Sequence, residues 1–92
     1  MVLEKWKSLD KMYVAYLPAI SGKDFIKFLE QLGFRITRIN GSHHRMKHED
    51  GRVTTVPVHK NDDLPKGLLR KIIREDIEIT LDEFLRLWQQ YR

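Results

Sequence analysis

The chain has 92 residues, of which 41% are apolar and 33% charged, and its formal net charge is +4. This composition is typical of one small globular domain, and the absence of cysteine excludes disulfides and thiolate chemistry. Because no apolar run reaches membrane-spanning length and the N-terminus "MVLEKWKSLDK" is too charged for a signal peptide, we expect a cytoplasmic protein without membrane contact.

The N-terminal third predicts two elements. Apolar residues recur at helical spacing over residues 2–16, although a strand within "MYVAYL" is the alternative, and Pro18 marks a boundary in either case. The stretch "SGKDFIKFLEQLG" (21–33) predicts a helix, because Ser21 can cap it, Asp24 lies near its positive end and Gly33 ends it. Its apolar face would be formed by Phe25, Phe28, Leu29 and Leu32.

Three short strands are predicted next, over residues 34–39, 42–48 and 52–58. Asn40-Gly41 favours a tight hairpin turn between the first two strands, and "EDG" (49–51) supplies a second turn. Pro57 indicates that the third strand lies at an edge or ends there, since proline cannot donate to a central ladder.

Two helices complete the chain. Asp63 and Pro65 open the first, and Thr80 and Glu83 form a capping box for a last helix over residues 80–91. The expected apolar residues are Leu68, Leu69, Ile72 and Ile73 in the first, and Leu81, Phe84, Leu85 and Trp88 in the second. The whole pattern predicts an α+β domain with helices on one face of an antiparallel sheet and the other face open.

The central segment carries the excess positive charge. Residues 35–60 hold six Lys/Arg against two Asp/Glu, together with all four histidines. A basic patch on an otherwise balanced chain indicates an anionic partner, most plausibly nucleic acid, with a solvated surface as the alternative.

Strand alternation separates the adjacent histidines of "GSHHRMKH". Met46 should face the core, so His44 and His48 share its side, whereas His43 points to the open face with Arg45 and Lys47. His44 and His48 would lie about 13 Å apart at ~3.3 Å per residue, too far apart to share a zinc ion. We therefore expect no metal and no cofactor.

His43 is the candidate for proton transfer. An imidazole exchanges protons near neutral pH, adjacent cations can hold a phosphate, and RNA supplies its own nucleophile in the 2′-hydroxyl. The alternative is a surface histidine on a phosphate-binding sheet that performs no chemistry.

Five stretches in one order carry a family resemblance. They are "ISGKDFIKFLEQLGF", "GSHHRMKHEDGR", "VPVH", "LPKGLLRKIIRE" and "TLDEFL", spread over about residues 17–85. Together they resemble HicA, the messenger-RNA-cleaving toxin of HicA–HicB toxin–antitoxin pairs.

The resemblance implies a fold like the double-stranded-RNA-binding domain and a metal-independent endoribonuclease. A HicB-like antitoxin would inhibit it by covering the active face. The catalytic histidine follows a Gly-Ser pair, here Gly41-Ser42, which assigns the role to His43, with His44 as the runner-up. His59 matches a position where the family often has histidine, and we interpret it as a strand-end residue that orders the following loop.

The same resemblance implies one domain, residues 1–92, with three parts. We expect residues 1–17 to form an N-terminal extension, 18–76 the HicA-like core and 80–91 the C-terminal helix. The segment "EDIEI" (75–79) replaces the family's usual Ala-Gly and is about one residue longer.

The candidate RNA-binding residues are cations. Arg45 and Lys47 share the face of His43, and three others could extend the patch: Arg38, Lys60 and Lys66. Alternatives to a nuclease are a non-catalytic RNA-binding module of the same fold, and a homo-oligomer that associates through Trp6 and Trp88. The helical spacing of both tryptophans favours core or protein contacts over base stacking.

Overall fold

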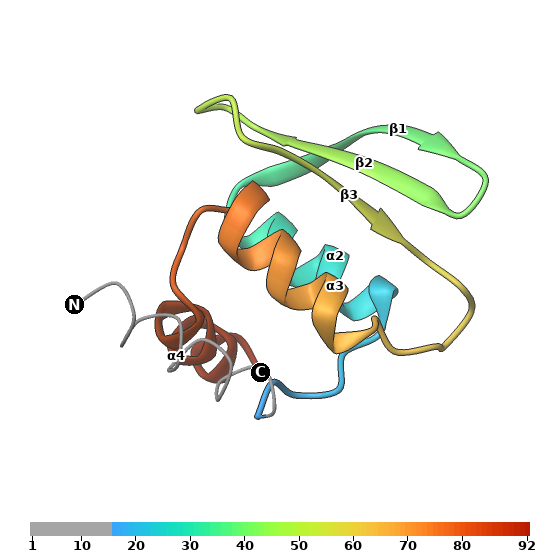
Figure 1. Ribbon diagram of the computed structural model, residues 1–92. Helices are drawn as coiled ribbons and strands as arrows, with labels where there is room; N and C mark the ends of the chain where they lie inside the picture. Colours follow the sequence, from blue (N-terminus) through green and yellow to red (C-terminus); the bar gives the residue numbers. More distant parts are fainter. Residues whose placement is uncertain (1–15) are drawn as a thin grey trace.

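The computed structural model describes residues 16–92 (Figure 1). Its elements are α2 (Gly22–Gln31), β1 (Phe34–Asn40), β2 (His43–His48), β3 (Val53–Pro57), α3 (Lys66–Lys71), the π-helical turn η1 (Ile72–Asp76) and α4 (Leu81–Tyr91). This order confirms the α+β class and the arrangement of helix, three antiparallel strands and helix, as in the double-stranded-RNA-binding domain. The predictions of a helix or strand before Tyr16 fall outside the described residues.

Helix α2 begins and packs as its sequence predicts. The Ser21 hydroxyl accepts a hydrogen bond from the Asp24 backbone N–H at 3.1 Å, which satisfies one of the free donors at the helix start. Phe25, Phe28 and Leu29 are buried along one face, while Gly33 follows the helix with φ +99°. This positive φ allows the chain to reverse directly into β1.

The three strands form one antiparallel sheet in the order β1-β2-β3. The first hairpin turns through Gly41 and Ser42, one residue later than predicted, because Asn40 pairs with His43. Gly41 has φ +60°, and Ser42 keeps a negative φ, as a type II′ turn requires at its two central positions. Pro57 ends β3, which is an edge strand as expected.

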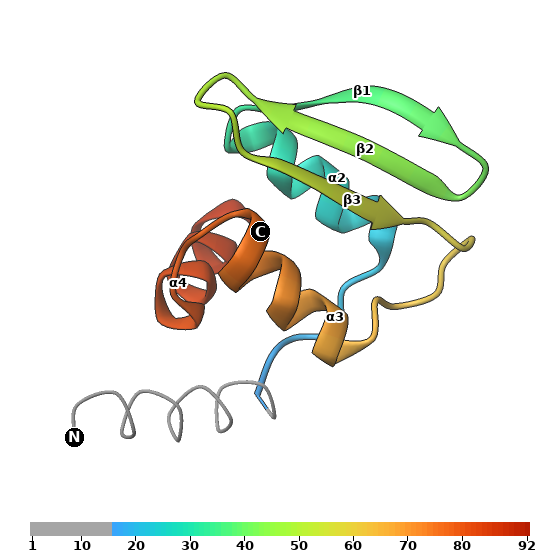
Figure 2. The ribbon, with the colours of Figure 1, turned by 45° about the horizontal axis from the view of Figure 1, so that its top comes forward.

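Both α2 and α3 lie on the same side of the sheet (Figures 1 and 2), so within residues 16–92 the other side is open. Helix α3 follows Pro65 and continues into η1, where the Ile77 N–H donates to the Ile72 carbonyl five residues earlier. The core between the helices and the sheet includes Phe25, Phe28, Leu29, Phe34, Met46, Val56, Leu69, Ile73, Ile77 and Phe84.

Helix α4 packs against α2 through aromatic rings. The Phe28 ring meets those of Phe84, Trp88 and Tyr91 edge-on, at centroid distances of 5.4, 5.3 and 5.5 Å. Trp88 is therefore partly buried against the core, as its helical spacing predicts. The Thr80 hydroxyl caps α4 by accepting from the Glu83 N–H. The Glu83 carboxylate is bonded to Arg86, so among the described contacts it does not complete the reciprocal half of the predicted capping box.

Candidate active site

Strand β2 presents its side chains alternately to the two sides of the sheet. Met46 is fully buried and His44 and His48 are partly buried, whereas His43, Arg45 and Lys47 are exposed. This pattern confirms the predicted separation of the adjacent histidines. The side of the sheet that the helices leave uncovered therefore carries His43 together with two cations.

Cross-strand pairing brings two more cations to this side. Arg38 lies opposite Arg45, and Arg35 lies opposite Lys47. Directly paired residues of an antiparallel sheet project to the same face, so all four cations share the open face. The strand β3 adds only uncharged residues there, namely Val53, Thr55 and Pro57, which pair with β2.

A β-bulge at Thr37 explains why Arg35 and Arg38 share a face despite their spacing of three. The register shifts between Ile36 and Arg38, and Thr37 is left without a pairing partner. The Thr37 hydroxyl donates to the backbone carbonyl of Arg45 at 3.4 Å across the bulge. In a regular strand Arg35 and Arg38 would point to opposite sides.

His43 stands at the hairpin end of this face. It is the first residue of β2 and pairs with Asn40 on one side and Pro57 on the other. Among the described contacts, no hydrogen bond or ion pair occupies its ring, so both ring nitrogens are accessible to a ligand on the open face. An accessible imidazole beside cations can transfer a proton to or from a bound phosphate ester.

His44 occupies a different environment on the helical side. Its Nδ1 lies 3.2 Å from the Ser42 carbonyl, and because a carbonyl can only accept, this contact favours the tautomer with hydrogen on Nδ1. The ring borders a groove of about 350 Å³ between α2 and the sheet. The other residues that line this groove are Lys23, Ile26, Lys27, Glu30, Ile36 and Val58.

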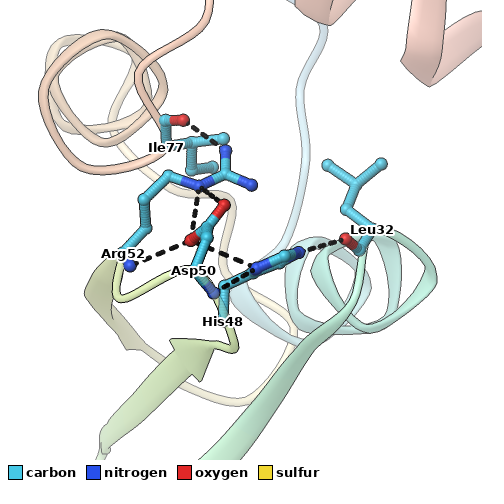
Figure 3. Close-up of polar contacts among 5 residues, drawn as sticks. All are labelled: Leu32, His48, Asp50, Arg52 and Ile77. Atoms are coloured by element: carbon cyan, nitrogen blue, oxygen red, sulfur yellow. Dashed lines mark hydrogen bonds and ion pairs between the residues drawn. The ribbon is translucent and has the colours of Figure 1, made fainter.

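His48 belongs to a polar network at the opposite end of the sheet (Figure 3). Its Nε2 lies 3.1 Å from the Leu32 carbonyl, and its Nδ1 lies 3.1 Å from the backbone N–H of Asp50. The Leu32 carbonyl can only accept, so Nε2 carries hydrogen, and Nδ1 also lies 3.1 Å from the Asp50 carboxylate. His48 therefore ties the end of α2 to the β2–β3 turn.

The same network fixes Asp50 and Arg52. The Arg52 Nε donates to the Asp50 carboxylate at 2.8 Å, and Arg52 Nη1 donates to the Ile77 carbonyl at 2.6 Å. The hydrogen bonds that the Arg52 side chain and backbone N–H donate to the Asp50 carboxylate lower the pKa of Asp50 below its ordinary value. The Arg52 guanidinium also lies 5.2 Å from the centre of the Phe34 ring. These contacts indicate that Arg52 stabilises the fold at this end of the sheet.

The model of the family described as "HicA toxin of bacterial toxin-antitoxin" matches residues 22–77, from the start of α2 to the end of η1. The chain belongs to the HicA toxin family. The match includes every residue of the sheet, and membership implies a toxin with an antitoxin partner of the HicB type. No curated protein sequence matches this HicA chain.

The HicA sheet gathers some of the predicted site residues and leaves others apart. His43, Arg45, Lys47 and Arg38 share the open face. Lys60 is exposed in the connection from β3 to α3, and Lys66 is exposed at the first turn of α3, so neither lies on the sheet. His59 is exposed in the same connection, where its carbonyl accepts from the Asp62 N–H at 2.9 Å.

Arg35 is the cation that sequence reasoning missed. Arg38 was named as a possible extension of the patch and Arg35 was not, although regular alternation would assign the two to opposite faces. The sequence does contain a signal for this placement. Two cations, Arg35 and Arg38, are three residues apart, and so are two apolar residues, Ile36 and Ile39. Two pairs offset in this way indicate one extra residue in the strand, which is a bulge.

Two further observations concern the described part of this HicA chain. Residues 16–92 contain no cluster of three or more His, Cys, Asp or Glu side chains with the spacing to hold a metal ion. In the same range, no helix has the length and apolar character needed to cross a bilayer.

Proposed function

We propose that this HicA protein is a metal-independent endoribonuclease that cleaves messenger RNA. One observation carries the proposal: His43 is exposed on a sheet face whose charged residues within the described chain are all basic. Such a face attracts the phosphate backbone, and it places a group that exchanges protons near neutral pH beside the bound phosphate.

The proposed reaction uses the 2′-hydroxyl of the RNA as the nucleophile. The 2′-oxygen attacks the adjacent phosphorus and loses its proton to a base, while the bond from phosphorus to the 5′-oxygen breaks and that oxygen gains a proton. The products are a 2′,3′-cyclic phosphate and a 5′-hydroxyl end. His43 supplies one of these proton transfers, and Arg45 and Lys47 bind the phosphate backbone of the RNA on the same face.

The test is RNA cleavage by the purified protein in excess EDTA, with wild type, His43→Ala and His44→Ala side by side. We expect His43→Ala to lose about 10²–10⁴-fold in rate, the usual contribution of general acid–base catalysis, and His44→Ala to retain activity. RNA with 2′-O-methyl groups should resist cleavage, and product ends should carry the cyclic phosphate. Efficient cleavage of the methylated RNA would contradict this mechanism.

The same experiment separates the alternatives. Loss of cleavage in His44→Ala alone would transfer the catalytic role to the groove beneath the sheet. If folded wild type binds RNA but leaves it intact, the protein is a non-catalytic RNA-binding module. In that case His43→Ala should bind RNA as tightly as wild type.

We also propose that the HicB-type antitoxin inhibits by covering the open face. The face is free of acidic side chains within the described residues, so an acidic partner surface would complement it. Adding the antitoxin should then displace a fluorescent 2′-O-methyl RNA from the protein. A ternary complex that still holds the RNA would exclude inhibition by coverage.

A further inference from the structure

The four cations of the open face are arranged as opposed pairs of like charge. Arg38 faces Arg45 and Arg35 faces Lys47 across the β1–β2 ladder, and all four side chains are exposed. Within the part of the chain that the structure describes, no carboxylate forms an ion pair with any of them. Directly opposed like charges destabilise a sheet, so the free protein holds an unfavourable arrangement that a bound polyanion would relieve.

Each pair forms one rung across β1 and β2, and the two rungs follow one another along the strands. Successive outward residues of β2 are about 6.8 Å apart, at ~3.4 Å per residue, so the Arg38–Arg45 rung is one such step from His43. The Arg35–Lys47 rung is two steps away. The charge does not spread across the sheet, because the partners on β3 are Thr55 and Val53.

The width of this strip indicates what it accommodates. Two neighbouring strands lie about 4.8 Å apart, so the rungs offer one narrow track for a single sugar-phosphate backbone. Each rung can hold a phosphate between two cationic side chains. The sheet offers no second line of cations, because the β3 residues on this face are uncharged.

We infer that a single RNA strand lies along β1 and β2 with its cleaved phosphate at His43 and its next two phosphates on the two rungs. This inference rests on the proposed function for the position of the cleaved bond. It assigns Arg35 as a fourth phosphate-binding residue. On the sheet itself the cations lie on one side of His43, because beyond His43 the sheet ends in the Gly41-Ser42 turn, which carries no charge.

The first test measures how the opposed cations affect the stability of the protein without RNA. Thermal unfolding is compared for wild type, Arg35→Gln, Lys47→Gln and the double variant, with Lys27→Gln as the control. Lys27 is exposed on α2, on the helical side of the sheet. We expect each single open-face variant to raise the melting temperature, and the double variant to gain less than the sum, because either change removes the repulsion. Additive changes in the melting temperature, or a rise equal to that of Lys27→Gln, would show that the paired cations do not repel one another and would contradict the proposal.

The second test measures binding and cleavage against RNA length. Binding uses fluorescent 2′-O-methyl oligonucleotides that grow by one phosphate, and cleavage uses the unmethylated series with one scissile site. Affinity should rise with each phosphate that reaches a rung and then level off, and Arg35→Gln should weaken only the longer oligonucleotides. Cleavage should fall several-fold when the two phosphates on one side of the scissile bond are removed, and not when those on the other side are.

The two proposals fail in different ways. If no RNA is cleaved but affinity still rises in two steps that Arg35→Gln and Lys47→Gln abolish, the rungs are supported and the nuclease proposal is wrong. If cleavage depends on His43 but neither RNA length nor Arg35→Gln alters binding or rate, the nuclease proposal stands and the rungs are overturned.

Discussion

Three histidines within six residues of one strand have different surroundings, and those surroundings decide what each can do. The ring of His48 has both nitrogens engaged, by the Leu32 carbonyl and the Asp50 N–H. The ring of His44 has Nδ1 engaged by the Ser42 carbonyl. Among the described contacts, only His43 presents both nitrogens on a face that could bind RNA, which is why the proton-transfer role is proposed for it.

Asp50 should make the stability of the protein depend on pH, because hydrogen bonds from Arg52 lower its pKa. A carboxyl whose folded pKa lies below its unfolded value of about 3.9 stabilises the fold above that value. The contribution is then lost as the pH falls through the folded pKa. Asp50→Asn should therefore lower the melting temperature at pH 7 and shrink the difference from wild type below about pH 3.9.

The measurement is thermal unfolding of both proteins from pH 7 down to pH 2. Asp62→Asn is a suitable control, because Asp62 is also exposed. A deficit for Asp50→Asn that stays constant over the whole pH range would show that the carboxylate charge is not what stabilises the turn.

At the scale of elements, local rules predicted most of the fold. Capping residues placed the starts of α2 and α4, and alternation around Met46 placed His43, Arg45 and Lys47 on one face. These features depend on neighbours a few residues away, which the sequence displays directly. The bulge at Thr37 depends on how β1 registers against β2, so the sequence of β1 alone does not place Arg35 beside Lys47.

The π-helical turn η1 is a second feature that periodicity did not predict. It spans Ile72–Asp76, directly after α3 and before Ile77. A π turn accommodates one extra residue within a helix, and here the Ile77 N–H bonds to the Ile72 carbonyl. Ile72, Ile73 and Ile77 all remain buried, so the additional residue does not remove apolar side chains from the core.

Gly22 makes a prediction at the junction of α2 with the sheet. A Cβ at this position would lie 2.2 Å from the Pro57 carbonyl oxygen and 3.2 Å from the Val58 Cα, which are backbone atoms. Gly22→Ala should therefore destabilise the protein by about 1–3 kcal/mol, the usual cost of overpacking, despite the better helix propensity of alanine. Urea unfolding at pH 7 measures this difference.

Gly67 supplies the matched control in α3. No atom lies within 4 Å of a Cβ built there, so Gly67→Ala should stabilise the protein by up to about 1 kcal/mol through helix propensity alone. If Gly22→Ala also stabilised the protein, the prediction that α2 lies too close to the end of β3 to admit a Cβ at this position would be wrong.

At the scale of the whole molecule, the position of the helices determines the site. Because α2 and α3 lie on one side of the sheet (Figure 2), the side chains on the core side are apolar, and those on the other side can be charged. The sequence predicted this division and the location of the basic segment. It could not show that Lys60 and Lys66 lie off the sheet, since the path of the β3–α3 connection is set by tertiary contacts such as the Leu64 N–H to the Ile20 carbonyl.

The charge of the open face makes the last prediction, for the salt dependence of RNA binding. Each phosphate neutralised on single-stranded nucleic acid contributes about −0.7 to the slope of log K against log salt. Two phosphates held on the two rungs predict a slope of about −1.4, whereas one rung alone predicts about −0.7. Titrations of fluorescent 2′-O-methyl RNA at several salt concentrations distinguish these values.

Double variants then locate the contacts on the molecule. Removing both cations of one rung, in Arg35→Gln/Lys47→Gln or Arg38→Gln/Arg45→Gln, should reduce the magnitude of the slope by about 0.7, while Lys27→Gln on the helical side should leave it unchanged. A slope that responds to Lys27→Gln and not to the double variants would place the RNA on the helices. The open face would then not be the RNA-binding surface, and the opposed cations of β1 and β2 would need another anionic partner.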